Sequence, residues 1–400
     1  MSEVIDTANN NNEDTNGIAL MQFPKEVLSR LQPDLVLQRH LHLGLRPSTL
    51  MKFNEFRNVE EQSNDSLIVN HSTASQDQDN TNSNNSGDLI VANNLLKVGN
   101  MFIKTDLSLG ITAVETANID EESFAPIWPE VTVDRGRMGA PTDEEMIASR
   151  QLYENIISGK YIKQKDLIIS KIGKKHLESE EISYDMADDD DDNDELLLEN
   201  KNKWCFVIYA KINVYSREGP IYDHVFNSLM LALQKLKFPS VYIEESSIDL
   251  QISSKKSFNR KQKQETKRTF NMKFDFGACN KLSLNSDIAI SSNFGVIYKD
   301  PTMAINALDE QETNEEKEED AMDIEKENTD FKKEPILIND ISTDIEEQAI
   351  LSKVSISCNS KNYKSIKLMN GSNNEKISVQ QLKQALKFSK MRYEDLKPTI

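Results

Sequence analysis

Arg135 and Arg137 stand on either side of Gly136, and this spacing brings two guanidinium groups close together. Guanidinium groups bind phosphate oxygens through paired hydrogen bonds, so the pair is a candidate contact for a nucleic-acid backbone. Two arginines in one loop also occur where surface or interface salt bridges form. The residues alone leave both interpretations open.

A second basic segment spans residues 255–268 and holds seven bases against one acid. Lysine and arginine release counterions when they meet nucleic acid, so the segment could bind RNA phosphates. It could equally form an exposed hairpin loop or serve nuclear import. The sequence does not decide between these functions.

The other reactive side chains form no recognisable catalytic or metal-binding set. His40 and His42 lie two apart on an expected helix, so they point to different faces and cannot share a metal. The three cysteines are far apart in apolar surroundings, which favours buried free thiols in a reducing compartment over a zinc site. The sequence contains no nucleophile elbow, phosphate-binding loop or calcium loop. We therefore expect no metal and no cofactor.

The formal net charge of −19 is concentrated in two segments, residues 185–199 and 309–334. Each segment carries −9, so the remainder of the chain carries −1. Runs of like charge repel themselves and stay solvated, which predicts disordered acidic inserts in a nearly neutral folded part. The overall acidity therefore does not argue against a nucleic-acid partner. The polar, acidic start and the lack of a membrane-length apolar run predict a soluble intracellular protein.

Residues 203–243 give the strongest structural signal. Trp204 to Tyr215 is a dense apolar run rich in aromatic and β-branched residues, as in a strand covered on both faces. From Tyr222, apolar residues recur every three or four positions and predict an amphipathic helix. Val241 to Ile243 begins another strand. We interpret this as a βαβ unit, and the turn at 216–220 is where α/β folds collect ligands.

Local signals place further elements on either side of this unit. Gly99-Asn100 predicts a hairpin turn. Thr142 with Glu145, and Ser378 with Gln381, form capping boxes that begin two helices. Strands are expected at 111–115, 131–133, 248–253, 270–276, 288–290, 294–298, 336–338, 354–358 and 366–368.

These elements predict an α/β (α+β) fold with two α/β domains. The expected organisation is a disordered tail at 1–20, a first domain at 21–245 with inserts at about 60–87 and 185–200, and a second domain at 246–400 with an acidic insert at about 305–334. The first insert is rich in Asn, Ser, Gln and Asp.

Seven blocks, in order, resemble the RNase PH family, in particular the RNase PH-like core-ring subunits of the eukaryotic RNA exosome. The blocks are residues 23–47, 53–59, 95–105, 133–146, 203–234, 292–302 and 377–392. The resemblance implies two α/β domains, each with a sheet and packed helices. Active members degrade RNA from the 3′ end by phosphorolysis. They hold phosphate in a strand-to-helix turn of pattern D-G-G-[ST]-R, and carboxylates on a late strand bind a metal.

This chain departs from the active pattern at three places. Pro220, Ile221 and Tyr222 stand where the pattern has Gly, Ser or Thr, and Arg, which predicts a degenerate phosphate site. The segment after Asp300 lacks a spaced pair of aspartates. The D-G-R signature near Arg46 is replaced by Ser-Thr-Leu. We therefore expect no catalytic residues, no metal and no enzyme activity.

The resemblance implies a non-catalytic structural and RNA-guiding subunit of the exosome core ring, acting in 3′-to-5′ RNA processing and degradation, including ribosomal RNA maturation. Arg135 and Arg137 match a loop with which non-catalytic members reach RNA. The implied partners are other RNase PH-like subunits in a hetero-oligomeric ring, exosome cap proteins and RNA, without a membrane, in nucleus, nucleolus and cytoplasm. Two alternatives remain: an active phosphate-dependent 3′-5′ exoribonuclease, and an acidic binding protein for basic partners such as histones.

Overall fold

The computed structural model of the chain describes thirteen segments. They are residues 27, 31–47, 49–62, 90–115, 127–136, 139–169, 171–175, 182–184, 202–251, 267–282, 288–299, 334–369 and 377–397. The expected tail at 1–20 and the expected insert at 185–200 lie outside this part. So do the other two expected inserts, apart from residues 60–62 and 334, which belong to strands.

The first sheet has the strand order β1-β2-β3-β7-β4. Its strands are β1 (Val59–Gln62), β2 (Ile90–Val98), β3 (Met101–Glu115), β7 (Asn202–Tyr215) and β4 (Ile127–Val133). Strands β2 and β3 form the expected hairpin around Gly99-Asn100. The edge strand β4 runs parallel to β7, and the other pairs are antiparallel. The dense apolar run therefore lies in the interior of this sheet.

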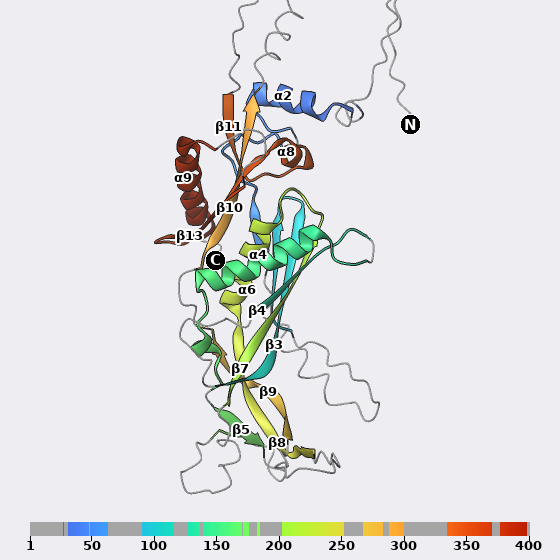
Figure 1. Cartoon of the computed structure of the whole chain (residues 1–400), viewed down its shortest axis with the longest axis vertical. Helices are drawn as coiled ribbons and strands as arrows, with labels where there is room; N and C mark the ends of the chain where they lie inside the picture. The colour runs from blue at the N-terminus through green and yellow to red at the C-terminus, as the bar shows by residue number, and fades with distance from the viewer. Residues whose placement is uncertain are drawn as a thin grey trace, which may run out of the picture.

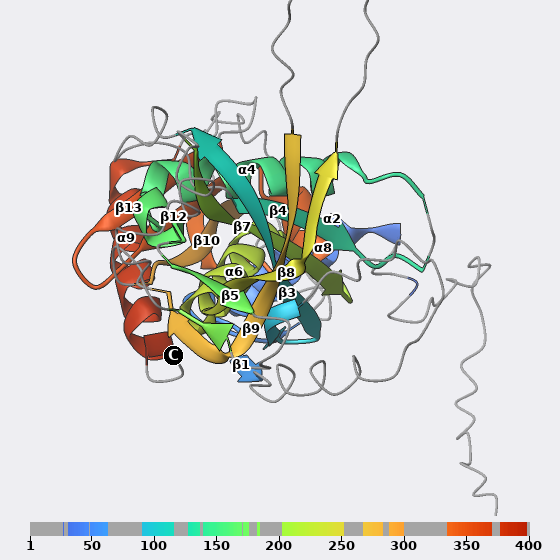
Figure 2. The same ribbon diagram turned by 90° about the horizontal axis from the view of Figure 1, so that it is seen from below.

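The second sheet has the order β11-β10-β12-β13, and all its pairs are antiparallel. Its strands are β11 (Glu334–Asn339), β10 (Ile290–Lys299), β12 (Ser352–Cys358) and β13 (Tyr363–Met369). A third, smaller sheet comprises β6 (Ile182–Ser183), β5 (Ile172–Lys175), β8 (Lys237–Gln251) and β9 (Lys267–Lys281). Figure 1 shows the second sheet toward one end of the long axis, and Figure 2 shows the third sheet across the other end.

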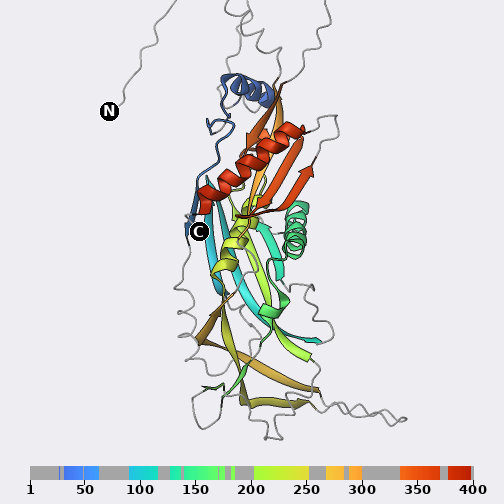
Figure 3. The same ribbon diagram turned by 90° about the vertical axis from the view of Figure 1, so that its left-hand side faces the viewer.

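Helices fill the space between the first two sheets and cover the second. The helices are α2 (Pro33–Leu43), α4 (Asp143–Gly159), α6 (Tyr222–Lys235), α8 (Asp344–Ala349) and α9 (Val379–Leu396), with a short 3-10 turn at Gln164–Leu167. Helix α6 contacts β2, β3 and β7 on one side and β10 on the other, so it is buried around most of its circumference. Helix α9 lies across the strands of the second sheet (Figure 3).

Glycine ends the first of these helices, and the two predicted capping boxes are confirmed. Gly44 ends α2 with φ 74°. The Thr142–Glu145 and Ser378–Gln381 capping boxes are present at the starts of α4 and α9. None of the helices in the described segments is long and apolar enough to span a membrane.

The strand–helix–strand order of residues 203–243 is confirmed, but the interpretation as a βαβ unit within one sheet is wrong. Strand β7 is flanked by β3 and β4, whereas β8 pairs with β5 and β9 in the third sheet. Both edges of β7 are occupied, so the strand after α6 cannot join it. Helix α6 instead leads the chain out of the first sheet.

The expected domain boundary at 245/246 falls inside β8. Strand β9, assigned by sequence to the second domain, pairs with β8, and its Met272 and Phe274 pack against the core of the first sheet. Conversely, Leu37 and Leu41 of α2, assigned to the first domain, pack with apolar residues of the second sheet. The N-terminal segment thus helps to build the second core.

Candidate functional site

The turn between β7 and α6 (residues 216–221) is pressed against the segment that follows β11. Gly219 has φ 69°, a conformation that favours glycine. A Cβ atom at this position would lie 2.4 Å from the carbonyl oxygen of Ile341. Because the Gly219 backbone meets the Ile341 backbone this closely, the path of the turn is set by the second sheet.

The three residues of the predicted degenerate phosphate site face different surroundings. Pro220 has no N–H to offer an anion. Ile221 is 2% exposed and belongs to the main apolar core. The hydroxyl of Tyr222 accepts a hydrogen bond from Asn155, and the Lys367 ammonium lies 4.3 Å from the centre of its ring. Burial raises the pKa of Tyr222, so this phenol stays neutral.

A carboxylate of the protein lies at the N-terminal end of α6, where the helix dipole favours negative charge. The buried Asp223 accepts hydrogen bonds from the hydroxyls of Ser355, at 2.5 Å, and Ser291. Burial raises the pKa of Asp223, and these two hydrogen bonds act in the opposite direction. A cavity of about 70 Å³ lies beside the turn and is lined by Tyr222, Asp223 and Lys367 among others. The polar groups of this helix end therefore bind one another.

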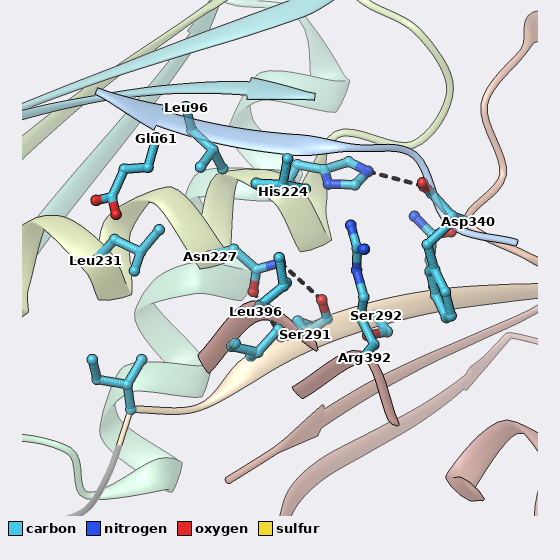
Figure 4. A pocket seen from close by; sticks show the side chains of 15 residues that line it. Glu61, Leu96, His224, Asn227, Leu231, Ser291, Ser292, Asp340, Arg392 and Leu396 are labelled. Atoms are coloured by element: carbon cyan, nitrogen blue, oxygen red, sulfur yellow. Dashed lines mark hydrogen bonds and ion pairs between the residues drawn. The ribbon is translucent and has the colours of Figure 1, made fainter. Parts of the chain in front are cut away.

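A buried ion pair lies on the other side of the turn. The Arg57 guanidinium donates to both carboxylate oxygens of Asp340, at 2.7 and 3.0 Å, and to the carbonyl oxygen of Glu218, at 3.3 Å. His224 of α6 lies 3.2 Å from the same carboxylate (Figure 4). Burial alone would raise the pKa of Asp340, but His224 and Arg57 hold it well below its usual range. Asp340 therefore remains ionised, and the network joins the N-terminal segment, the turn and β11.

A second buried pair lies next to the first. Arg46 is fully buried and binds both carboxylate oxygens of Glu346, at 2.9 and 2.6 Å. It also donates to the carbonyl oxygens of Asn339 and Asp340. Arg46 thus holds the end of β11 and the start of α8 together, although the D-G-R signature beside it is absent.

Asp340 directly follows the late strand β11, and Glu346 lies six residues further on, in α8. A pair of carboxylates associated with a late strand is what the resemblance implies for metal binding in active members. The surroundings of Asp340 and Glu346 do not fit a cation, because all four carboxylate oxygens accept hydrogen bonds from protein donors. No cluster of three or more metal-ligating side chains occurs among the described residues. Arg46 and Arg57 supply the positive charges that these two carboxylates face.

This pair was not predicted from the sequence, because the expected position for the two carboxylates was after β10, beside Asp300. Asp300 lies outside the described residues. The available signal was the short strand at 336–338 followed by two acids six residues apart. A long acidic segment separates that strand from β10 in the sequence, while the two strands are neighbours in the sheet.

The arginine loop (residues 134–141) connects β4 to α4, and its two ends are held by one side chain. The buried carboxylate of Glu145 accepts from the backbone N–H of Val133, at 2.7 Å, and of Thr142, at 2.5 Å. Burial alone would raise the pKa of Glu145, but the hydrogen bonds from Thr142 and Val133 outweigh it and lower the pKa. The capping box was predicted, and the contact with Val133 was not.

Arg135 projects from this loop and is 36% exposed at its side chain, where it pairs with Glu144 at 2.8 Å. Arg137 and the basic residues 255–266 lie outside the described residues, so their proposed roles remain predictions. Glu144 also binds Arg217 of the β7–α6 turn, at 2.9 Å. The arginine loop and the β7–α6 turn, which were predicted as two separate sites, are therefore neighbours in the structure.

The fold is similar to those of solved exosome proteins. A chain of the Archaeoglobus fulgidus exosome with RNA bound to the active site is 13% identical, with a TM-score of 0.52 and coverage of 93% of this chain and 99% of that chain. A chain of an archaeal exosome core is 12% identical, with a TM-score of 0.50 and coverage of 94% and 100%. No family model and no curated protein matches the sequence. The likeness establishes the expected mixed α/β, RNase PH-like fold.

Proposed function

We propose that this chain is a non-catalytic structural and RNA-guiding subunit of the RNA exosome core ring, of the ribosomal RNA-processing protein 43 type. The fold supports a place in such a ring, because both similar structures are exosome proteins and match over nearly their whole length. One of them belongs to an exosome with RNA bound to the active site, which supports RNA as a partner.

One observation carries the non-catalytic part of the proposal, namely what fills the β7–α6 turn. Phosphorolysis needs an inorganic phosphate bound by N–H and hydroxyl donors near the scissile bond. In this turn Pro220 lacks a donor, Ile221 is in the core, and Asp223 places a carboxyl at the helix end. An incoming phosphate would meet apolar surface and a carboxyl group.

The proposed partners are other RNase PH-like subunits, exosome cap proteins and RNA. The proposed setting is RNA turnover and ribosomal RNA maturation in nucleus, nucleolus and cytoplasm. Arg135, and by its sequence Arg137, are the proposed RNA contacts. Purification of the full chain with its partners, followed by mass spectrometry, is expected to return several RNase PH-like subunits.

The catalytic question is tested on the purified chain with RNA, inorganic phosphate and Mg²⁺. The expected result is no release of nucleoside diphosphates, with a phosphorolytic RNase PH enzyme as positive control. Robust release would show an active exoribonuclease instead. A chain lacking 185–199 and 309–334 is expected to assemble normally, whereas loss of all partner binding would favour an acidic binding protein.

A further inference from the structure

Glu144 lies between two guanidinium groups that belong to different parts of the fold. On one side it pairs with Arg135 of the arginine loop, at 2.8 Å. On the other side it pairs with Arg217 of the β7–α6 turn, at 2.9 Å. The Glu144 side chain is 32% exposed, so solvent and ligands reach this junction.

The two arginines differ in how firmly the protein holds them. Arg217 is bound by three carboxylates, since Asp344 and Glu347 of α8 pair with it at 3.2 and 2.8 Å in addition to Glu144. Burial alone would lower the pKa of Arg217, but Glu144 and Glu347 outweigh this effect and raise it. Arg217 therefore connects α4, the turn and α8 and is not available to a ligand.

Among the described residues Arg135 forms one ion pair, with Glu144, and it also interacts electrostatically with the neighbouring Glu145. It is the more exposed of the two arginines. An exposed ion pair of this kind is weak. A phosphate accepts two parallel hydrogen bonds from one guanidinium and competes well for it. If Arg135 moves to a phosphate, Glu144 keeps Arg217 as its counter-charge and is not left unpaired.

We propose that Glu144 controls the RNA affinity of the arginine loop, because it neutralises Arg135 in the free protein and retains only its existing pairing with Arg217 when an RNA phosphate binds Arg135. This inference rests on the proposed RNA-guiding function and adds a positioning residue to it. Glu144 itself touches no RNA. The free energy needed to break the Glu144–Arg135 ion pair is subtracted from the free energy of RNA binding.

The test measures binding of a fluorescently labelled oligouridine to the assembled complex that contains the full chain. Glu144→Gln is expected to tighten binding by about two- to fivefold, the range that corresponds to one exposed ion pair. Glu154→Gln is the matched control, because it removes one negative charge from an exposed ion pair on the same helix, 4 residues from its partner Arg150. It is expected to leave the affinity unchanged.

A second measurement asks whether the effect of Glu144→Gln on RNA affinity depends on Arg135. A purely structural effect of Glu144 would not depend on Arg135. In the Arg135→Ala background, Glu144→Gln is expected to have no effect on RNA affinity. The inference is overturned if Glu144→Gln leaves affinity unchanged, if Glu154→Gln tightens it equally, or if the gain survives Arg135→Ala. Failure of the proposed function is distinguished by the absence of co-assembling subunits, whereas failure of this inference alone leaves assembly intact.

Discussion

Arg57 and Asp340 lie 283 positions apart in the sequence and form a two-armed ion pair in the interior of the protein. The guanidinium is 3% exposed and the carboxylate 4%. A buried pair of this kind contributes little compared with an apolar pair, but removal of one partner leaves an uncompensated charge. The pair therefore favours the arrangement in which the N-terminal segment packs on the second sheet, because any other arrangement separates the two charges.

Arg57→Met is expected to destabilise the protein by about 3–5 kcal/mol, because Asp340 would remain buried without its guanidinium. Arg57→Met combined with Asp340→Leu is expected to recover more than half of this loss. The measurement is the free energy of unfolding from urea titration. Arg150→Ala, which breaks an exposed pair on α4, serves as control and should cost less than about 1 kcal/mol. An equal effect of both single variants would contradict the prediction.

Asp223→Asn is expected to stabilise the protein at pH 7. Burial raises the folded-state pKa of Asp223 above its unfolded value, so ionisation costs stability as pH rises from the unfolded pKa of about 4. The amide cannot ionise and keeps an oxygen for the two serine hydroxyls. The gain should shrink as pH falls toward 4, measured by urea titration across pH. Asp340→Asn should show the opposite sign at pH 7, because its folded pKa is lowered.

Gly219→Ala is expected to destabilise the protein by about 1–3 kcal/mol more than Gly44→Ala. Both glycines have positive φ, at 69° and 74°, so the backbone strain is similar. A methyl group at Gly44 meets nothing within 4 Å, whereas at Gly219 it meets the Ile341 carbonyl at 2.4 Å. Thermal unfolding of the two variants isolates the effect of that contact. Equal losses would show that the turn can move away from β11.

Glu145→Gln is expected to loosen the base of the arginine loop. The amide group can accept from only one of the two N–H groups that the carboxylate serves, since its other end is a donor. Loss of one hydrogen bond should speed amide exchange of Val133 or Thr142 by about tenfold. Hydrogen–deuterium exchange measures this directly, with Glu154→Gln as control. Unchanged protection of both amides would show that the loop ends are held by other contacts.

Restoring the active pattern in the turn is expected to restore no phosphorolysis. The variant carries Glu218→Asp, Pro220→Gly, Ile221→Ser and Tyr222→Arg. It supplies phosphate donors, but Asp340 and Glu346 stay bound to Arg57 and Arg46 and remain unavailable to a metal. Nucleoside diphosphate release is measured alongside assembly with partner subunits, which controls for folding. Release by an assembled variant would show that the turn alone prevents catalysis.

Signals that depend on a few neighbouring residues predicted local structure correctly. The Gly99-Asn100 hairpin and both capping boxes follow from residue types a few positions apart, and helix α6 follows from the period of its apolar residues. The structure contains all of them. Sheet membership was not predictable in this way. Strands β7 and β8 flank one helix but belong to different sheets, because strands distant in sequence occupy both edges of β7.

The candidate site also has features that local sequence predicts and features that depend on how the sheets pack. The sequence by itself determined which donors the β7–α6 turn lacks, because proline has no N–H and isoleucine has no side-chain donor wherever they lie. Only the tertiary structure decided what surrounds that turn. Arg57 and Asp340 are joined by a contact between distant segments, as are Glu144 and Arg217. Such contacts depend on how whole sheets pack, and no local pattern encodes them.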